Sequence, residues 1–342
     1  MSALVSVIMR TRNRPIFLSR ALASVQAQQL GDYELIIVND GGETQIVQEA
    51  LDKTTPELQA RTQVVTNRVS NGREAALESG LACASAPFFA IHDDDDTWDP
   101  QFLSKTVAFL QAHPHLGAVA ARTQLVSEKL ESDGTITILE RADLALERHS
   151  FNLIDMLVGN YIPPISQLIR RASADLVGHW DGRLSTQADW DFNLRLLQAQ
   201  PAGFLEGPAL AFWHQRPGLA GESGNSVITA ALEHQQDNLA IRESYLRTDS
   251  PNPLLGQALV SAEYYRRSQA QLEQVSQGVH EALNLVHADL NQQVAALTEQ
   301  VQQLSEQLAQ LQELTGQLQE GTLSARLGKL RGSVSSEESC AL

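Results

Sequence analysis

Residues 88–100 read FFAIHDDDDTWDP, and this stretch decides the fold class of the chain. Its first four apolar residues predict a short buried strand, and four carboxylates, Asp93–Asp96, follow it after a single histidine. We name these four residues the acid run. Asp99 and Pro100 then predict the start of a helix, with Asp99 as the N-cap and Pro100 in the first helical position.

The acid run requires a counter-charge, because four adjacent carboxylates repel one another. Hard divalent cations such as Mg²⁺ and Mn²⁺ supply one directly, since they prefer carboxylate oxygens together with substrate phosphates. The preceding strand fixes the run at a sheet edge, which favours a cation site. An acidic turn that only caps the next helix is the alternative.

The sequence on the N-terminal side of the acid run repeats an order of strand, turn and helix. Strands are predicted at Leu4–Met9, Tyr33–Val38 and Gln63–Thr66. Helical segments between them predict an α/β fold with an open, mostly parallel sheet and helices on both faces. Ligands of such sheets bind beyond the carboxyl ends of the strands. Asp40 and the acid run both follow strands, so we expect them at one edge.

Composition excludes several function classes. The chain has 342 residues, 41 acidic and 25 basic, with a formal net charge of −16. Such acidity argues against nucleic-acid binding, which depends on Lys and Arg. Its two cysteines, Cys83 and Cys340, supply neither a disulfide framework nor a cysteine-based zinc site. The sequence predicts no signal peptide and no transmembrane segment. We therefore expect a cytoplasmic protein and leave open a peripheral contact with the inner membrane face.

The C-terminal part has a different organisation. A domain is predicted over 1–250, a partly helical linker over 251–270, a coiled coil over 271–320 and a disordered tail over 321–342. Two series of residues recur every seven positions, a double spacing that only a heptad repeat gives: Leu290, Leu297, Leu304, Leu311 and Leu318, with Val294, Val301, Leu308 and Thr315 on the companion seam. Val at one seam and Leu at the other favour a parallel dimer, a preference that Leu308 and Thr315 weaken, and we expect a homo-oligomer formed through this coiled coil. A single helix folded back on the domain is the alternative.

Five pieces of the first 215 residues resemble an inverting family 2 glycosyltransferase. They are VSVIMRTRNRP at 5–15, YELIIVNDG at 33–41, Arg73, IHDDDDTWDP at 91–100, and DWDFNLRL at 189–196. The resemblance implies a GT-A fold with a Rossmann-like sheet. It also implies a metal-dependent enzyme that moves a hexosyl-type sugar from a nucleotide-sugar donor to an acceptor hydroxyl, with inversion. A glycan or lipid-linked acceptor, as in surface polysaccharide assembly, would be typical. The coiled coil lies outside the resemblance.

The resemblance assigns five residues to the nucleotide. Thr11, at the end of the first strand, lies where the family binds the nucleotide base. Asp40 matches the acid that hydrogen-bonds the edge of the base, although an Asp-Gly turn residue is the plainer explanation of its pattern. Arg73 matches a helix residue that faces the diphosphate. Asp93 and Asp94 match positions that reach the ribose or a metal-bound water.

The resemblance also implies a metal site. Asp95 matches the direct ligand of Mn²⁺ or Mg²⁺, which would stabilise the charge that develops on the leaving diphosphate. His214 is offered as a second ligand by analogy with other GT-A enzymes, with a partly buried structural histidine as the alternative. Arg216 and the Gly- and Ser-rich segment 218–226 are predicted to close over the diphosphate.

Asp189 matches the catalytic base of the family. A sugar hydroxyl is a very weak acid, so a carboxylate must accept its proton as the oxygen attacks the anomeric carbon. The start of a helix is predicted at Asp189, where the helix dipole should lower its pKa. Asp191, on another face of that helix, is expected to pair with Arg195.

Two departures from the family pattern leave a second function open. Ala188 stands where the family commonly has Glu, and His92 stands where an apolar residue is usual. The alternative is a degenerate nucleotide-sugar-binding scaffold that organises partners through its coiled coil. A dehydrogenase is excluded, because no G-x-G-x-x-G follows the first strand. A nucleotidyltransferase is disfavoured, because the first turn has no glycine-rich loop with a lysine.

Overall fold

The computed structural model describes residues 3–184, 186–217, 231–247 and 253–337. The chain divides into two compact units, Met1–Arg266 and Arg267–Leu342. The first unit extends past residue 250, because the start of helix α11 (Pro253–Glu337) packs into its core through Leu255 and Leu259. The Gly- and Ser-rich segment 218–226, predicted to close over a ligand, lies outside the described residues.

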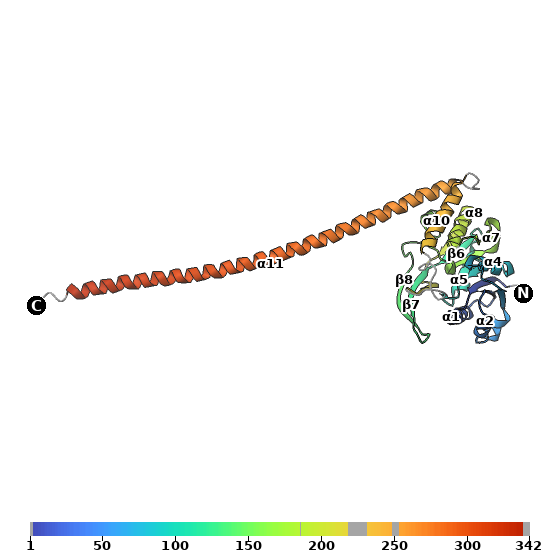
Figure 1. Ribbon diagram of the computed structural model, residues 1–342, viewed down its shortest axis with the longest axis horizontal. Coiled ribbons are helices and arrows are strands. Elements are labelled where there is room, and N and C mark those ends of the chain that lie inside the picture. The colour runs from blue at the N-terminus through green and yellow to red at the C-terminus, as the bar shows by residue number, and fades with distance from the viewer. Residues whose placement is uncertain (1–2, 185, 218–230, 248–252, 338–342) are drawn as a thin grey trace. The chain divides into compact units, whose positions relative to one another are not determined.

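Seven strands form the central sheet, in the order β10-β6-β9-β4-β1-β2-β3. Figure 1 shows the strands of the first unit among the helices that cover them. They are β1 (Val5–Thr11), β2 (Tyr33–Asp40), β3 (Thr62–Asn67), β4 (Phe88–Ile91), β6 (Ala118–Ala121), β9 (Gln167–Arg170) and β10 (Ala202–Leu205). Neighbouring strands run parallel, except that β9 is antiparallel to β4 and β6. The predicted mostly parallel sheet is confirmed.

The centre of this sheet is buried on both faces, as its sequence requires. Every residue of β1 is buried, and β4 is buried throughout. Strands covered on both faces lack the alternation of apolar and polar residues that a half-exposed strand shows. The near-continuous apolar runs at 5–9 and 88–91 therefore place β1 and β4 at the middle of the sheet.

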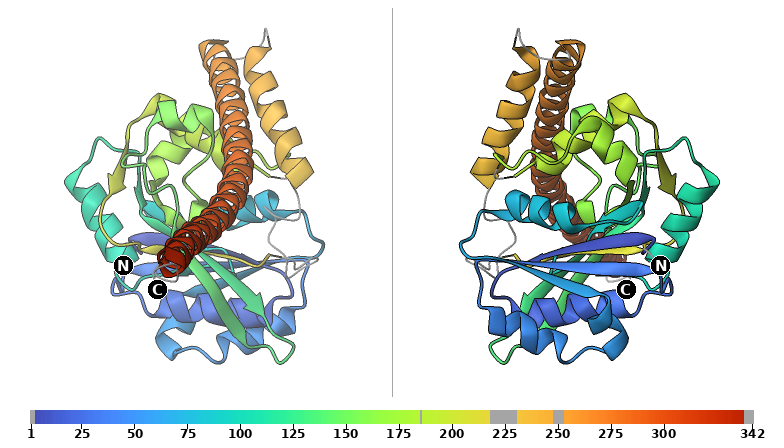
Figure 2. Two further views of the ribbon diagram at one scale, coloured as in Figure 1. Left: turned by 90° about the vertical axis from the view of Figure 1, so that its left-hand side faces the viewer. Right: turned by 90° about the vertical axis from the view of Figure 1, so that its right-hand side faces the viewer.

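Helices cover the two faces in separate layers, which Figure 2 shows on opposite sides of the strands. One layer contains α1 (Pro15–Gln26), α2 (Thr44–Leu51), α3 (Pro56–Ala60) and α5 (Phe102–Ala112). The other contains α4 (Arg73–Cys83), α6 (Leu153–Val158), α7 (Arg171–Val177), α8 (Ala188–Ala199) and α10 (Ala231–Leu246). Helix α4 lies very close to β1, since a Cβ added at Gly80 would come within 2.6 Å of Ile8 Cγ2.

A second, four-stranded sheet follows the acid run. Its order is β5-β11-β7-β8, formed by β5 (Thr97–Trp98), β11 (Ala211–Gln215), β7 (Thr123–Leu130) and β8 (Ile136–Asp143). A short 3₁₀ helix, η1 (Pro164–Ser166), precedes β9. Because β5 begins one residue after Asp96, its pairing with β11 fixes where the acid run ends.

The strand register brings the predicted polar residues to one edge. Thr11 is opposite Asn39 in the β1–β2 pair, and Ile8 is opposite Ile91 in the β1–β4 pair. The ends of β1, β2 and β4 therefore lie side by side, with Asp40 and the acid run at the same edge. This is the arrangement that the order of strands and turns predicts.

Two local expectations differ from the structure. Helix α5 begins at Phe102 with Gln101 as its N-cap, so the predicted N-cap at Asp99 is wrong. The Asp99 amide instead donates to the Leu210 carbonyl at 2.9 Å, and Asp99 Oδ1 accepts the Gln101 amide at 2.9 Å. These two bonds hold residues 99–101 in a turn. The tail predicted to be disordered from residue 321 continues α11 to Glu337. Residues 338–342 lie outside the described part.

In the second unit the structure describes helix α11 from Arg267 to Glu337. Its apolar side chains are exposed along the heptad positions, from Leu290 at 53% to Leu318 at 70%. A continuous exposed apolar stripe of this kind marks an interaction surface in most proteins. Among the described residues, no helix is both long enough and apolar enough to cross a membrane.

Candidate active site

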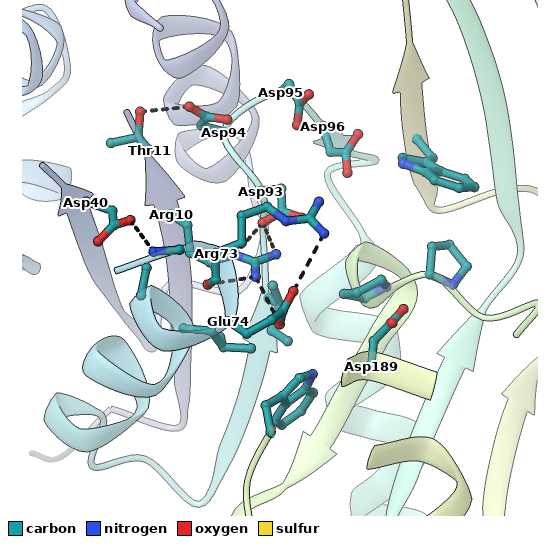
Figure 3. Close-up of a pocket in the computed structure, with 18 of the residues that line it drawn as sticks. Arg10, Thr11, Asp40, Arg73, Glu74, Asp93, Asp94, Asp95, Asp96 and Asp189 are labelled. Atoms are coloured by element: carbon teal, nitrogen blue, oxygen red, sulfur yellow. Dashed lines mark hydrogen bonds and ion pairs between the residues drawn. The ribbon is translucent and has the colours of Figure 1, made fainter. Parts of the chain in front are cut away.

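A pocket of about 560 Å³ opens at the carboxyl ends of β1, β2 and β4 (Figure 3). Seven of the eight residues that the sequence nominates line it: Thr11, Asp40, Arg73, Asp93, Asp94, Asp95 and Asp189. His214, the eighth, is not among these lining residues. The acid run comes from the end of β4, whereas Asp189 comes from α8 and lies apart from it in Figure 3.

Arg10, at the end of β1, joins three elements of the site. Its Nε and Nη2 donate to Asp93 Oδ1 at 2.8 and 2.5 Å, and its Nη1 donates to the Arg73 carbonyl at 3.2 Å. Nη1 also lies 3.5 Å from Glu74 Oε2. Burial would raise the pKa of Asp93, but the charges of Arg10 and Arg73 outweigh it and hold that pKa below its usual value. Asp93 is therefore ionised and held in place by Arg10.

Asp94 takes different partners from Asp93. Thr11 Oγ1 donates to Asp94 Oδ2 at 2.7 Å, and Arg14 Nη1 donates to Oδ1 at 2.7 Å. Burial, and then the negative charge of Asp95, raise the pKa of Asp94 to about 6 despite the charge of Arg14. Thr11, which the resemblance assigns to the nucleotide, thus positions the acid run from the end of β1.

Asp95 is tied to a buried ion-pair network that the sequence did not reveal. Arg216 is fully buried and donates from Nη2 to Asp95 Oδ2 and from Nη1 to Glu128 Oε1 at 2.8 Å. Arg20 Nη1 also donates to Glu128 Oε2, at 2.7 Å. Although burial opposes it, hydrogen bonds from His214 and Arg20 lower the pKa of Glu128 to about 2. Arg216 lies beneath the pocket rather than over it, contrary to the expectation that it closes over the diphosphate.

His214 is held by protein on both ring nitrogens. Nδ1 lies 2.7 Å from Glu128 Oε2, and Nε2 lies 2.8 Å from Thr97 Oγ1. Burial lowers the pKa of His214 despite its carboxylate partner. Both nitrogens have protein partners, and His214 is not among the residues that line the pocket, so the structural alternative is the plainer one and the assignment as a metal ligand stays a prediction. The backbone amide of His214 donates to Asp96 Oδ1 at 2.9 Å, which anchors the last residue of the acid run.

The remaining residues fit a divalent cation that is completed by its substrate. The pocket lining carries seven carboxylates, including the acid run, against four guanidinium groups, and this surplus of hard oxygen donors favours Mg²⁺ or Mn²⁺. Among the described residues, no three His, Cys, Asp or Glu side chains converge to hold an ion alone. Mg²⁺ commonly takes only one or two carboxylates and completes its shell with phosphate and water. That Asp95 is the direct ligand, as the resemblance implies, stays a prediction.

Asp40 organises the loop before α4. Its carboxylate accepts four hydrogen bonds, from Asn67 Nδ2, Ser70 Oγ and the amides of Asn71 and Gly72, at 2.6 to 3.2 Å. These bonds outweigh burial and lower its pKa. Gly41 has a φ of 75°, which glycine tolerates, and a Cβ there would lie 2.4 Å from the Ser70 amide. Asp40 therefore shapes this end of the pocket by holding the loop at 67–72.

Arg73 begins α4 and lines the pocket with a side chain that is 44% exposed. Its Nη2 lies 3.6 Å from Glu74 Oε1. Burial raises the pKa of Glu74, although Arg10 and Arg73 oppose the rise. An exposed guanidinium at the first turn of a helix is suited to bind an anion that enters the pocket.

Asp189 has no guanidinium within hydrogen-bonding distance in the described contacts. Asn160 Nδ2 donates to its Oδ2 at 2.7 Å. Burial raises the pKa of Asp189, and the Trp190 amide and the charge of Arg73 only partly oppose the rise. The expectation that the helix dipole lowers this pKa is wrong, because burial outweighs the dipole. Asp191 pairs with Arg195 as predicted, at 2.9 Å.

Three pocket residues beside Asp189 went unnoticed in the sequence: Asn160, Gln187 and His234. Asn160 precedes a run of Tyr, Ile and Pro that gives no periodic signal, and His234 lies on α10 within a polar segment. Asn160 lies in a loop, Gln187 precedes α8 and His234 lies on α10, so tertiary packing brings them to one pocket.

Known sequences resemble this chain over the same region. Residues 6–172 match the sequence model of glycosyl transferase family 2. An uncharacterized glycosyltransferase of Bacillus subtilis, YwdF, is 31% identical over 56% of this chain and 67% of its own length. An uncharacterized glycosyltransferase of Haemophilus influenzae is 29% identical over 37% of this chain, which spans only 38% of that relative. A PGL/p-HBAD biosynthesis glycosyltransferase of Mycobacterium bovis is 25% identical over 56% of this chain and 68% of its own length.

Solved structures resemble the fold. TarS of S. aureus, in complex with UDP-GlcNAc, has a TM-score of 0.54 at 18% identity and covers 75% of this chain and 71% of its own. The mannosyltransferase PcManGT from Pyrobaculum calidifontis, in complex with GDP-Man and Mn²⁺, has a TM-score of 0.53 at 15% identity, over 77% of this chain and 70% of its own. At these identities the likeness establishes the fold alone.

Proposed function

The chain belongs to glycosyl transferase family 2, and we propose that it transfers a hexosyl-type sugar from a nucleotide-sugar to an acceptor hydroxyl, with inversion and with Mg²⁺ or Mn²⁺. One observation carries the proposal: a single pocket holds Asp189 together with Arg73 and the acid run. The first is suited to accept a proton, and the others are suited to bind a diphosphate and its cation. A glycan or lipid-linked acceptor, as the family resemblance implies, is part of the proposal.

The donor lies, in this proposal, with its diphosphate between Arg73 and the acid run. Arg73 offers an exposed guanidinium at the first turn of α4, and Asp95 would hold the cation together with phosphate oxygens. When bound, the cation would neutralise charge on the leaving diphosphate. Thr11 and the loop held by Asp40 form the end of the pocket that we assign to the nucleotide. Both named complexes, with UDP-GlcNAc and GDP-Man, support a hexosyl nucleotide donor of this class.

Asp189 is the proposed base. Its carboxylate accepts the proton of the acceptor hydroxyl as the oxygen forms a bond to the anomeric carbon. The bond from that carbon to the diphosphate breaks, and its electron pair leaves with the diphosphate, so that attack from the opposite face inverts the configuration. The raised pKa of Asp189 makes its ionised form a stronger proton acceptor than an exposed aspartate.

Nucleotide binding tests this proposal. Thermal unfolding should be followed with UDP, GDP, dTDP or CMP, each with and without Mn²⁺. A nucleotide at 100 times its Kd stabilises the folded chain by about 2.7 kcal/mol, a rise in Tm of about 5–10 °C. We expect one nucleotide to give this rise and EDTA to remove it. No rise with any nucleotide would contradict the proposal and favour the scaffold alternative.

We also propose that α11 pairs with a second copy of the chain. The exposed seam of Leu290, Leu297 and Leu304 has the heptad spacing of a coiled coil. Between residues 290 and 320 the sequence has only four charged residues, which recur every seven positions on the side away from the seam: Glu299, Glu306, Glu313 and Glu320. Like charges therefore point away from the partner, and the residues beside the seam are uncharged, as suits two identical helices.

A matched pair of variants tests the pairing. Leu304→Lys puts a charge in the seam, and we expect light scattering to show half the mass of the unchanged chain. Gln303→Lys adds the same charge one residue away, outside the seam, and should keep the full mass. Equal masses for Leu304→Lys and the unchanged chain would contradict the assignment of α11 as the interface.

A further inference from the structure

Helix α10 docks onto the segment that carries Asp189. Three of its side chains contact three residues around Asp189, at successive turns of one helix face. Asp237 accepts from the Thr186 amide and hydroxyl at 2.7 and 2.9 Å, Tyr245 donates to Asp191 at 2.8 Å, and Arg242 lies 4.8 Å from the centre of the Trp190 ring. The position of Asp189 therefore depends on α10.

A fourth contact joins α10 to the pocket itself. Gln187, two residues before Asp189, has a φ of 63°, in the left-handed region that few side chains other than Asn and Asp adopt readily. Its side chain lies in the pocket wall, where Nε2 donates to His234 Nδ1 at 2.8 Å. Because Nδ1 accepts this bond, the neutral ring carries its proton on Nε2.

The other nitrogen of His234 has no partner among the described residues. His234 Nε2 is buried from solvent, yet the ring lines the pocket. A buried N–H without an acceptor destabilises a fold, so such a group in a binding pocket points to a ligand that completes it. Burial, and then the positive charge of Arg73, lower the pKa of His234, which keeps the ring neutral at pH 7.

The surroundings of His234 define the chemistry of that ligand. An N–H donor that acts alongside a guanidinium is suited to an anionic oxygen. In the proposed reaction the terminal phosphate leaves the anomeric carbon on the face opposite Asp189, toward Arg73. The charge of Arg73 acts on His234, and both residues line the same pocket, so His234 lies on the side where this phosphate would be.

We propose that His234 binds the donor, and that its Nε2–H donates to an oxygen of the terminal phosphate of the nucleoside diphosphate. The assignment rests on the proposed function. It adds a substrate-binding residue from α10 to a site whose other assigned residues come from β1, β2, α4, α8 and the acid run after β4. It also explains why Gln187 adopts a left-handed backbone, since this conformation accompanies the bond that orients the imidazole.

Calorimetric titration of the full chain tests this proposal, with UDP, GDP, UMP and GMP as probes in the presence of Mn²⁺. With whichever nucleotide, uridine or guanosine, the unchanged chain binds, we expect His234→Ala to weaken binding of the diphosphate about tenfold. This is the loss of one hydrogen bond to a charged group. The affinity for the monophosphate should stay within about twofold. His234→Gln retains an N–H donor, so its affinity for the diphosphate should fall between those of the unchanged chain and His234→Ala.

Two control variants separate a contact with the ligand from a structural role. Tyr245→Phe removes a docking bond of the same helix and should keep diphosphate affinity within about twofold, and so should His280→Ala, on exposed α11. In NMR spectra, the imidazole Nε2–H signal of His234 should shift when the diphosphate is added and not when the monophosphate is added.

Three outcomes would overturn the assignment. Unchanged diphosphate affinity in His234→Ala, with normal binding by the unchanged chain, would refute this role and leave the proposed function standing. Equal weakening of diphosphate and monophosphate, matched by Tyr245→Phe, would assign His234 to docking of α10 alone. Failure of the unchanged chain to bind any probe would refute the proposed function and this role with it.

Discussion

The two sides of the pocket place aspartates in opposite environments. Asp93, in the acid run, lies against the guanidinium of Arg10, and its pKa is lowered. Asp189, on α8, lies against the amide of Asn160, and its pKa is raised. Both are largely removed from water, so burial alone does not separate them. The comparison teaches that the partner decides the role: a guanidinium fixes a carboxylate as an anion that holds structure and cation, whereas an amide leaves it able to accept a proton.

The largest effect should come from breaking the network beneath the acid run. Arg216→Met removes a guanidinium that pairs with both Asp95 and Glu128, and Glu128 is buried. Leaving buried charges uncompensated should lower the free energy of unfolding by about 3–5 kcal/mol. Urea unfolding of Arg216→Met and of the unchanged chain at pH 7 measures this loss of stability.

An exposed ion pair provides the matched control for Arg216. Arg183 pairs with Asp181 at 2.7 Å, but its side chain is 90% exposed. Arg183→Met should leave the free energy of unfolding close to that of the unchanged chain, because water screens an exposed ion pair. If the two variants lost equal stability, the network would not be the support that we infer.

A second effect is a pH dependence of stability that arises on the acid-run side of the pocket. His92, just before the acid run, is fully buried, and burial lowers its pKa to about 4. A lowered histidine pKa stabilises the folded state above pH 6.5, and this stability is lost as the pH falls toward 4. Across this range of pH the free energy of unfolding should fall by roughly 3 kcal/mol. His92→Gln should lack this part of the pH dependence.

Urea unfolding at several pH values between 7 and 4 measures the contribution of His92. His115 is exposed, so His115→Gln should keep the pH profile of the unchanged chain. Parallel profiles for His92→Gln and the unchanged chain would show that the ring does not titrate across this window.

The smallest effect sharpens the comparison most, because it predicts opposite signs. Asp93→Asn removes the charged partner of Arg10 and should lower the free energy of unfolding by about 1.5–3 kcal/mol. Asp189→Asn removes a carboxylate whose ionised form is disfavoured by burial, and it should leave stability unchanged or higher. Unfolding of both variants at pH 7 measures the difference, and a loss of equal size in both would erase the distinction.

Much of the fold and half of the site follow from local sequence. Strands β1 and β4 are apolar runs bounded by polar turns, and parallel strands bring their carboxyl ends to one edge, so Asp40 and the acid run could be placed together. The heptad spacing of α11 is likewise visible along the chain. These features depend on residues that are close in sequence.

The partners of the carboxylates could not be predicted in the same way. Glu128 lies on β7 beside Lys129 in a stretch that looks exposed, yet it is buried against residues from α1 and β11. His234 lies on a helix with little apolar periodicity, and several of the contacts that dock this helix are polar. The pKa of Asp189 was misjudged because a helix start is visible in the sequence, whereas burial by distant elements is not. Long-range packing decides each of these, and a single sequence records it only weakly.

The central claim is that Asp189 accepts the proton while the opposite side of the pocket binds the donor. It is tested most directly by Asp189→Asn, assayed with the nucleotide-sugar whose nucleotide stabilises the chain. The control Asp191→Asn lies two residues away and contacts Arg195 and Tyr245 instead. We predict that Asp189→Asn keeps its affinity for the nucleotide and loses transfer by about 10²-fold or more, while Asp191→Asn still transfers. Turnover by Asp189→Asn at the rate of the unchanged chain would contradict the claim.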